Sequence, residues 1–170
     1  MPGVRDFRDV SFAQPLVVRC GRFLGHNTYW KLYAIENYLR VIMHSVLSAQ
    51  IPSPWWDNAV DIKLKTKAEV VKRSYAMKPI HTSPGSHDIY YVFLPDLNKI
   101  ILANSNQFRP MIPDIDTWVT KVEEIWIPRN LVGHMNFPNP QDRKRIDKLY
   151  SEMSALMARL ERSTLPIQVP

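Results

Sequence analysis

The sequence is poor in cysteine, and this scarcity excludes two ways of stabilising a small fold. Its 170 residues include a single cysteine, Cys20, so no disulfide can form within the chain. Without a cluster of cysteines and histidines, a structural zinc site is not expected either. A chain of this length can bury a hydrophobic core of its own. We therefore expect one packed domain, with neither a metal nor a cofactor.

Long hydrophobic runs are also missing. No apolar stretch approaches the roughly 20 residues that a helix needs to cross a bilayer. The first residues, MPGVRDFRDV, are charged and lack the apolar stretch of a secretory signal. These two observations predict a cytoplasmic protein with no membrane partner.

Charge, in contrast, is biased towards one sign. The net charge of +6 favours a polyanionic partner such as nucleic acid, although charge alone does not establish one. Basic side chains gather at residues 63–73 and again at residues 143–148. Each cluster is either a solvated helix face or a surface that binds nucleic acid. Under the second interpretation, Arg143 and Lys144 are the candidate nucleic-acid-binding residues.

A strong helical pattern begins after an irregular start. Residues 1–26 contain several prolines and glycines, which predict an irregular N-terminal arm before a helical domain of residues 27–164. Apolar residues over 27–49 recur at spacings of three and four, the period of one buried helical face. That predicted face consists of Trp30, Tyr33, Ala34, Ile35, Tyr38, Leu39, Ile42, Met43 and Val46.

The rest of the chain also favours helices. Further helices are predicted over residues 56–77, 95–104, 116–127 and 140–161, with a loop at 78–88. Residues 89–94 form either a short strand or, as we prefer, a buried run that enters the next helix. Pro128 is expected to kink the helix that precedes it, or to start a new helix after residue 127. The predicted fold is all-α, an antiparallel bundle of four or five helices.

One segment, 128-PRNLVGHMNFPNP-140, combines groups with useful chemistry. It holds Arg129, Asn130 and His134 within six residues. An imidazole can transfer a proton near neutral pH, and a guanidinium can hold a phosphate. Cleaving RNA without a metal needs a base for the 2′-hydroxyl and donors for the phosphate oxygens. The alternative is a helix C-terminus at which His134 caps carbonyls and Arg129 is solvated.

Spacing leaves the geometry of this segment open. Residues five apart lie about 140° from each other around an ideal helix, so Arg129 and His134 do not stack on one ridge. They would converge if Gly133 loosened the turn, or if two copies met across a twofold axis. The sequence therefore allows a site within one chain or a site shared by a homodimer.

Other polar and aromatic residues have two interpretations each. Glu36 either pairs with an arginine for structure or orients Arg129 or His134, since a buried carboxylate needs a partner. We interpret His44 as a packed or capping residue, and His81 and His87 as exposed loop residues. The adjacent Trp55 and Trp56 are more typical of a core than of a base-stacking platform.

Three segments together resemble the HEPN superfamily, the higher eukaryotes and prokaryotes nucleotide-binding domains. The sequence R-N-L-V-G-H at residues 129–134 is similar to its R-N-x-x-x-H signature. The segment 35-IENYLRVIMHSVL-47 resembles an early E-x-x-L-R helix of one branch, and 90-YYVFLPDLNKIILAN-104 resembles the run that precedes the signature there. The three segments follow the order of the family.

The resemblance implies an all-α, usually dimeric, metal-independent endoribonuclease that leaves cyclic phosphate ends. By position, Arg129 and His134 are its catalytic pair and Asn130 the polar helper, with Glu36 and Arg40 supporting them. The implied partners are RNA, a second copy of the chain, and an antitoxin or other defence-system protein. Members often carry alanine where this chain has Gly133. Some members are inactive, so the alternative is a non-catalytic module that binds RNA, a nucleotide or a protein.

Overall fold

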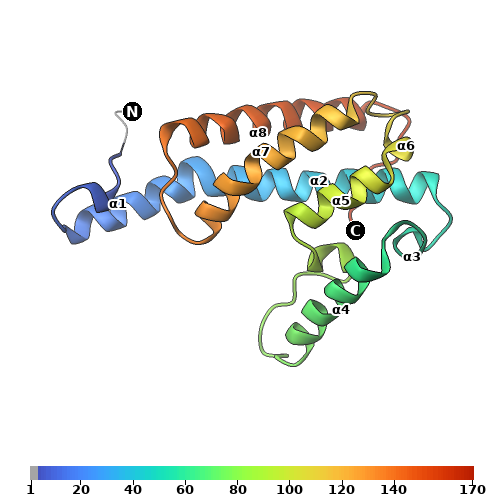
Figure 1. Cartoon of the computed structure of the whole chain (residues 1–170), viewed down its shortest axis with the longest axis horizontal. Coiled ribbons are helices and arrows are strands. Elements are labelled where there is room, and N and C mark those ends of the chain that lie inside the picture. Colours follow the sequence, from blue (N-terminus) through green and yellow to red (C-terminus); the bar gives the residue numbers. More distant parts are fainter. Residues whose placement is uncertain (1–3) are drawn as a thin grey trace.

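The computed structural model describes residues 4–170, and its regular elements are helices (Figure 1). The core of the molecule is built from four of them, namely α2 (Trp30–Gln50), α5 (Leu94–Ala103), α7 (Ile115–Gly133) and α8 (Pro140–Glu161). Helix α2 packs along α8, α5 packs along α7, and α7 also packs along α8. The predicted all-α fold is confirmed for the described residues.

The helix directions only partly match an antiparallel bundle. Helix α7 runs opposite to both α5 and α8, but α2 and α8 run the same way along the long axis of the molecule (Figure 1). The chain between α2 and α5 makes this arrangement possible, because it returns along the molecule through three short elements and a loop. These elements are α3 (Trp55–Ala59), α4 (Ile62–Ala76) and the 3₁₀ helix η3 (Asp88–Tyr91). A single turn, α6 (Ser105–Phe108), connects α5 to α7.

The arm predicted to be irregular is largely helical in its described part, residues 4–26, which corrects that prediction. A short 3₁₀ helix, η1 (Phe7–Asp9), precedes α1 (Gln14–Leu24), and a π-helical turn, η2 (Gly25–Tyr29), leads directly into α2. Pro15 lies in the first turn of α1, where a helix needs no amide donor. Helix α1 projects beyond the end of the bundle (Figure 1). Gly21, Gly25 and Pro15, which predicted an irregular arm, are thus tolerated within helical turns.

Two further boundaries differ from the predictions. The helix expected over 56–77 is broken before Asp61, whose side chain caps α4 by accepting the amide of Lys63 at 2.8 Å. Pro128 does not end or restart α7, which continues through it to Gly133. Pro128 cannot donate a hydrogen bond to the carbonyl of Glu124. Buried Ile125 and Val132 hold the helix to the core on either side of it.

Other local predictions are confirmed. Residues 89–94 form the buried entry to α5 rather than a strand, with Pro95 in the first turn of that helix. Helix α8 begins where predicted, and the Asn139 side chain caps it by accepting the amide of Asp142 at 2.8 Å. The tryptophans Trp55 and Trp56 belong to the core.

Candidate functional site

An open groove of about 720 Å³ lies between α2 and the C-terminal turns of α7. All five residues predicted as catalytic or supporting line it, namely Glu36, Arg40, Arg129, Asn130 and His134. Residues 84–86, in the loop before η3, form another part of its wall. The fold therefore brings the two helices of the HEPN-like pattern to one cavity, although their site residues lie about ninety positions apart in the chain.

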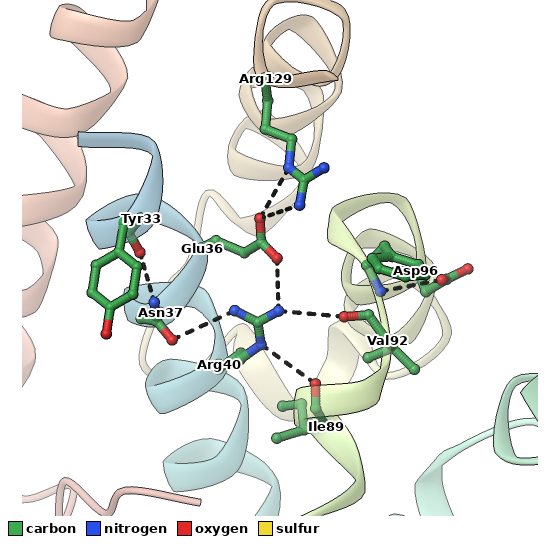
Figure 2. Close-up of polar contacts among 9 residues, drawn as sticks. Tyr33, Glu36, Asn37, Arg40, Ile89, Val92, Asp96 and Arg129 are labelled. Carbon is green, nitrogen blue, oxygen red and sulfur yellow. Dashed lines mark hydrogen bonds and ion pairs between the residues drawn. The ribbon is translucent and has the colours of Figure 1, made fainter. Parts of the chain in front are cut away.

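A carboxylate between two guanidinium groups forms the floor of the site (Figure 2). The Oε1 atom of Glu36 accepts a hydrogen bond from Arg40 Nη2 at 2.6 Å. Its Oε2 atom accepts two from Arg129, from Nε at 3.1 Å and Nη2 at 3.0 Å. Glu36 therefore combines the two roles considered for it. It pairs with Arg40, which holds the fold, and it orients Arg129.

Arg40 is fully engaged in holding the fold. Its side chain is buried, and it donates to the carbonyls of Ile89 at 3.4 Å and Val92 at 3.3 Å as well as to Glu36. These bonds attach η3 and the entry to α5 to helix α2. Arg40 supports the site by positioning Glu36 and the neighbouring backbone.

Arg129, in contrast, keeps a donor for a ligand. Its side chain is 29% exposed, compared with 10% for Arg40. Only Nε and Nη2 are used within the described residues, which leaves Nη1 without a hydrogen bond. A guanidinium that is oriented by a carboxylate and retains free donors suits the binding of an oxyanion.

His134 lies at the end of α7. Its backbone amide donates to the carbonyl of Asn130 at 3.0 Å, and the chain then turns at Met135, which has a positive φ of 60°. The backbone of His134 thus caps the helix, whereas its exposed imidazole makes no hydrogen bond within the described residues. Arg129 and His134 line the same groove within one chain, so a twofold partner is not needed to bring them together.

The charged side chains of the groove have a positive sum. They are two arginines and one glutamate, so their charges add up to one positive charge, with the imidazole of His134 left out of the count. The exposed Asn130 adds an amide that can donate or accept hydrogen bonds. An anion with several oxygen atoms, such as a phosphodiester, matches this set of donors.

Arg143 and Lys144, the predicted nucleic-acid contacts, lie outside the groove. The guanidinium of Arg143 is 5.3 Å from the ring centre of Phe23 and 5.4 Å from that of Phe137, and its Nη1 donates to the carbonyl of Pro138 at 2.8 Å. It joins the start of α8 to α1. Lys144 is exposed on α8. A contact of either residue with nucleic acid stays a prediction.

A cluster of histidine and tryptophan rings supports the loop beside the groove. The Nδ1 atom of His44 accepts the indole N–H of Trp55 at 3.0 Å, and that of His87 accepts the amide of Ile89 at 3.1 Å. The His87 ring also stacks on Trp55, with ring centres 5.2 Å apart. The interpretation of His44 as a packed residue is confirmed, whereas the prediction that His87 is exposed is wrong.

Partial burial favours the neutral form of both imidazoles. Desolvation lowers the pKa of His44 and is also the main cause that lowers the pKa of His87. The nearby His44 and Lys72 lower the pKa of His87 further, while Asp88 opposes them. Because His87 directly follows residues 84–86, this cluster fixes one wall of the groove.

The sequence-based prediction missed the tyrosines of the site. Tyr29, Tyr33 and Tyr90 line the groove, yet Tyr33 was assigned to the buried face of its helix. It is 67% exposed, and Trp30 from the same predicted face is 42% exposed. The four-residue spacing of Tyr29 and Tyr33, next to Glu36, was a signal that could have identified them.

Within residues 4–170, histidine, cysteine, aspartate and glutamate form no group of three or more that could bind a metal ion. In the same residues, no helix has both the length and the apolar character required to span a membrane. Comparisons with protein-family models, curated proteins and solved structures give no match.

Proposed function

We propose that this chain is a metal-independent endoribonuclease that cleaves RNA through attack of the 2′-hydroxyl. The observation that carries the proposal is the shared groove, in which Arg129 is oriented by Glu36 and His134 lies at the end of the same helix. The resemblance of residues 129–134 to the HEPN signature supports the same assignment.

In this mechanism, the scissile phosphate binds at Arg129. Its free Nη1 donates to a non-bridging oxygen, where negative charge increases in the transition state. The neutral imidazole of His134 accepts the proton of the 2′-hydroxyl as the new O2′–P bond forms. The P–O5′ bond breaks, and the leaving O5′ takes a proton from a second acid. The products are a 2′,3′-cyclic phosphate and a 5′-hydroxyl.

A homodimer would supply the second acid. Each chain contributes one imidazole to its own groove, since His44 and His87 are committed to the ring cluster. Two grooves that meet across a twofold axis would place the protonated His134 of one copy near the leaving oxygen. We extend the proposal to a cytoplasmic toxin or antiviral defence nuclease that is restrained by an antitoxin.

The test is RNA cleavage in the presence of EDTA. We expect wild-type protein to cut a single-stranded RNA oligonucleotide and to leave its 2′-O-methyl counterpart intact. His134→Ala should lower the rate by about 10²-fold or more, the usual contribution of a general base. Arg129→Ala should lower it by about 10²-fold, the usual cost of losing one transition-state donor.

Matched controls exclude contamination and misfolding. His81→Ala removes an exposed loop histidine and Arg159→Ala an exposed arginine, both outside the groove and outside the two basic clusters, so both variants should cleave at the wild-type rate. Cleavage that requires a divalent metal, or that survives His134→Ala, would overturn the mechanism.

A second candidate function is a non-catalytic module that binds nucleic acid or another anion. The observation that favours it is the double hydrogen bond from Arg129 to Glu36, which neutralises much of the guanidinium charge. In that case RNA should bind in a salt-dependent manner and remain intact. Arg129→Ala should then weaken binding, while His134→Ala should leave it nearly unchanged.

A further inference from the structure

Two tyrosine rings on the wall of the groove are at least half exposed. Tyr29 and Tyr33 are 50% and 67% exposed, and they lie one helical turn apart. Among the described residues, neither ring contacts another aromatic ring. Other tyrosines of the chain behave differently, since Tyr75, Tyr91 and Tyr150 each pack against an aromatic neighbour. Tyr33 is therefore an aromatic surface available to a ligand.

Tyr33 lies beside the charged network on the same helix (Figure 2). It precedes Glu36 by three residues and Asn37 by four, and the Asn37 amide donates to the carbonyl of Tyr33 at 2.8 Å. Side chains three and four apart share one face of a helix. Figure 2 shows the Tyr33 ring pointing away from the carboxylate of Glu36, although both residues line the groove. The groove thus contains an aromatic ring as well as a cation.

The facing wall is held in place by two other tyrosines. A Cβ atom on Gly85 would lie 2.4 Å from the ring of Tyr90, so only glycine fits there. The hydroxyl of Tyr91 donates to the carbonyl of Gly85 at 2.7 Å. Gly85 is therefore held in place within residues 84–86 of the groove wall, and Ser86 adds an exposed hydroxyl.

We propose that Tyr33, with Tyr29 next to it, forms a stacking site for an unpaired base of the strand whose phosphate binds at Arg129. This proposal rests on the proposed function and specifies its substrate as single-stranded nucleic acid. Stacking on an aromatic side chain suits every base, because each has a π-face. A paired base within a duplex has both faces covered, and the grooves of A-form RNA do not present them.

Binding of an uncleavable strand tests the site independently of catalysis. The probe is a fluorescent, single-stranded 2′-O-methyl RNA octamer, and its affinity is measured by anisotropy in EDTA. Tyr33→Ala should weaken binding about tenfold, and Tyr33→Phe should bind within about twofold of wild type, since the ring carries the interaction. Phe12→Ala is the matched control, because it removes an 81% exposed ring outside the groove.

Two further measurements separate stacking from other roles of the ring. An abasic position in the probe should weaken binding to wild type about as much as Tyr33→Ala does, and should add nothing further in that variant. The salt dependence should be the same for Tyr33→Ala as for wild type, whereas Arg129→Ala should reduce its slope by about one phosphate contact.

Several outcomes would overturn the stacking site. These are a wild-type chain that does not bind the octamer, a Tyr33→Ala variant that binds normally, and a Tyr33→Phe variant as weak as Tyr33→Ala. A Tyr33→Ala variant whose sedimentation shows an altered oligomeric state would assign the ring to a contact between copies. RNA cleavage with normal octamer binding by Tyr33→Ala removes the stacking site and keeps the nuclease. Ring-dependent binding without cleavage removes the nuclease and keeps the stacking site.

Discussion

The groove network and the ring cluster both place polar side chains among packed helices, but they use them differently. In the ring cluster, the Nδ1 atoms of His44 and His87 are both occupied by internal donors. In the groove, Glu36 is saturated by two arginines, yet Arg129 retains Nη1 and His134 retains its imidazole. The difference is that the groove keeps exposed hydrogen-bonding groups that internal contacts do not use, as a binding or catalytic site requires.

Removing the central carboxylate should have the largest effect on stability. Glu36→Ala leaves the guanidiniums of Arg40 and Arg129 without their counter-ion, and Arg40 is buried. Breaking a buried ion pair in this way costs about 3 kcal/mol or more of unfolding free energy. Urea denaturation at pH 7 measures the change.

Two matched variants sharpen this prediction. Glu123→Ala removes an exposed carboxylate of α7 and should change the unfolding free energy by less than about 0.5 kcal/mol. Arg129→Ala should cost only about 1 kcal/mol, because Glu36 keeps its bond to Arg40. If Glu36→Ala were as stable as Glu123→Ala, the network would not be part of the structural core.

Loss of one member of the ring cluster should lower the unfolding free energy by less than loss of Glu36 does. His87→Ala removes the ring stacked on Trp55 and leaves the buried amide of Ile89 without its acceptor. An unsatisfied buried donor costs about 1–3 kcal/mol. We expect a loss of about 2 kcal/mol in urea denaturation and faster proteolysis of the loop at residues 78–88. His81→Ala, in the same loop but exposed, should behave as wild type, and equal stability of the two variants would contradict this role.

Acid should weaken the ring cluster. The pKa values of His44 and His87 are lowered in the folded protein, so the unfolded chain binds protons at a higher pH. The stabilising contribution is fully present above about pH 6.5, the ordinary value, and is lost as the pH falls through the lowered values. Unfolding free energies at pH 7.5, 6.5 and 5.5 should therefore decrease. The decrease should be smaller in His87→Ala, and an unchanged pH profile would argue against the cluster as its source.

The smallest effect is expected at Gly133. A Cβ atom there would lie 3.7 Å from Arg129 Nη1, an ordinary contact, and no glycine of the described chain has a positive φ. Gly133→Ala should raise the unfolding free energy by about 0.5–1 kcal/mol, since alanine is favoured in a helix. Thermal unfolding measures this gain, and RNA cleavage should be retained. Loss of cleavage with normal stability would show that the site depends on glycine.

Local patterns predicted several elements well. The start of α8 followed from Asn139 and Pro140, because capping and a proline in the first turn act within a few residues. The helical face of α2 was also found, but two residues at its edge, Trp30 and Tyr33, are exposed. Periodicity gives the direction of a buried face, whereas the neighbouring helices decide how wide it is.

The errors arose where tertiary packing outweighed local preference. Gly21 and Gly25 predicted an irregular arm. Gly21 instead lies within α1, and Gly25 begins the π-helical turn that leads into α2. Pro128 predicted a break, yet the packing of Ile125 and Val132 keeps α7 continuous through it. His87 was assigned to solvent because its loop is rich in proline and serine. Its partner Trp55 is more than thirty positions away, so no local pattern contained that contact.

The sequence by itself determined the helices, the positive charge, and the presence of an arginine and a histidine at the end of one helix. Only the tertiary structure decided that Glu36 would hold Arg129 across 93 positions of the chain, and that Tyr33 would face a groove. The physical reason is range. Caps, breakers and helical periods act between residues a few positions apart, whereas the pairing of side chains on different helices depends on how those helices pack.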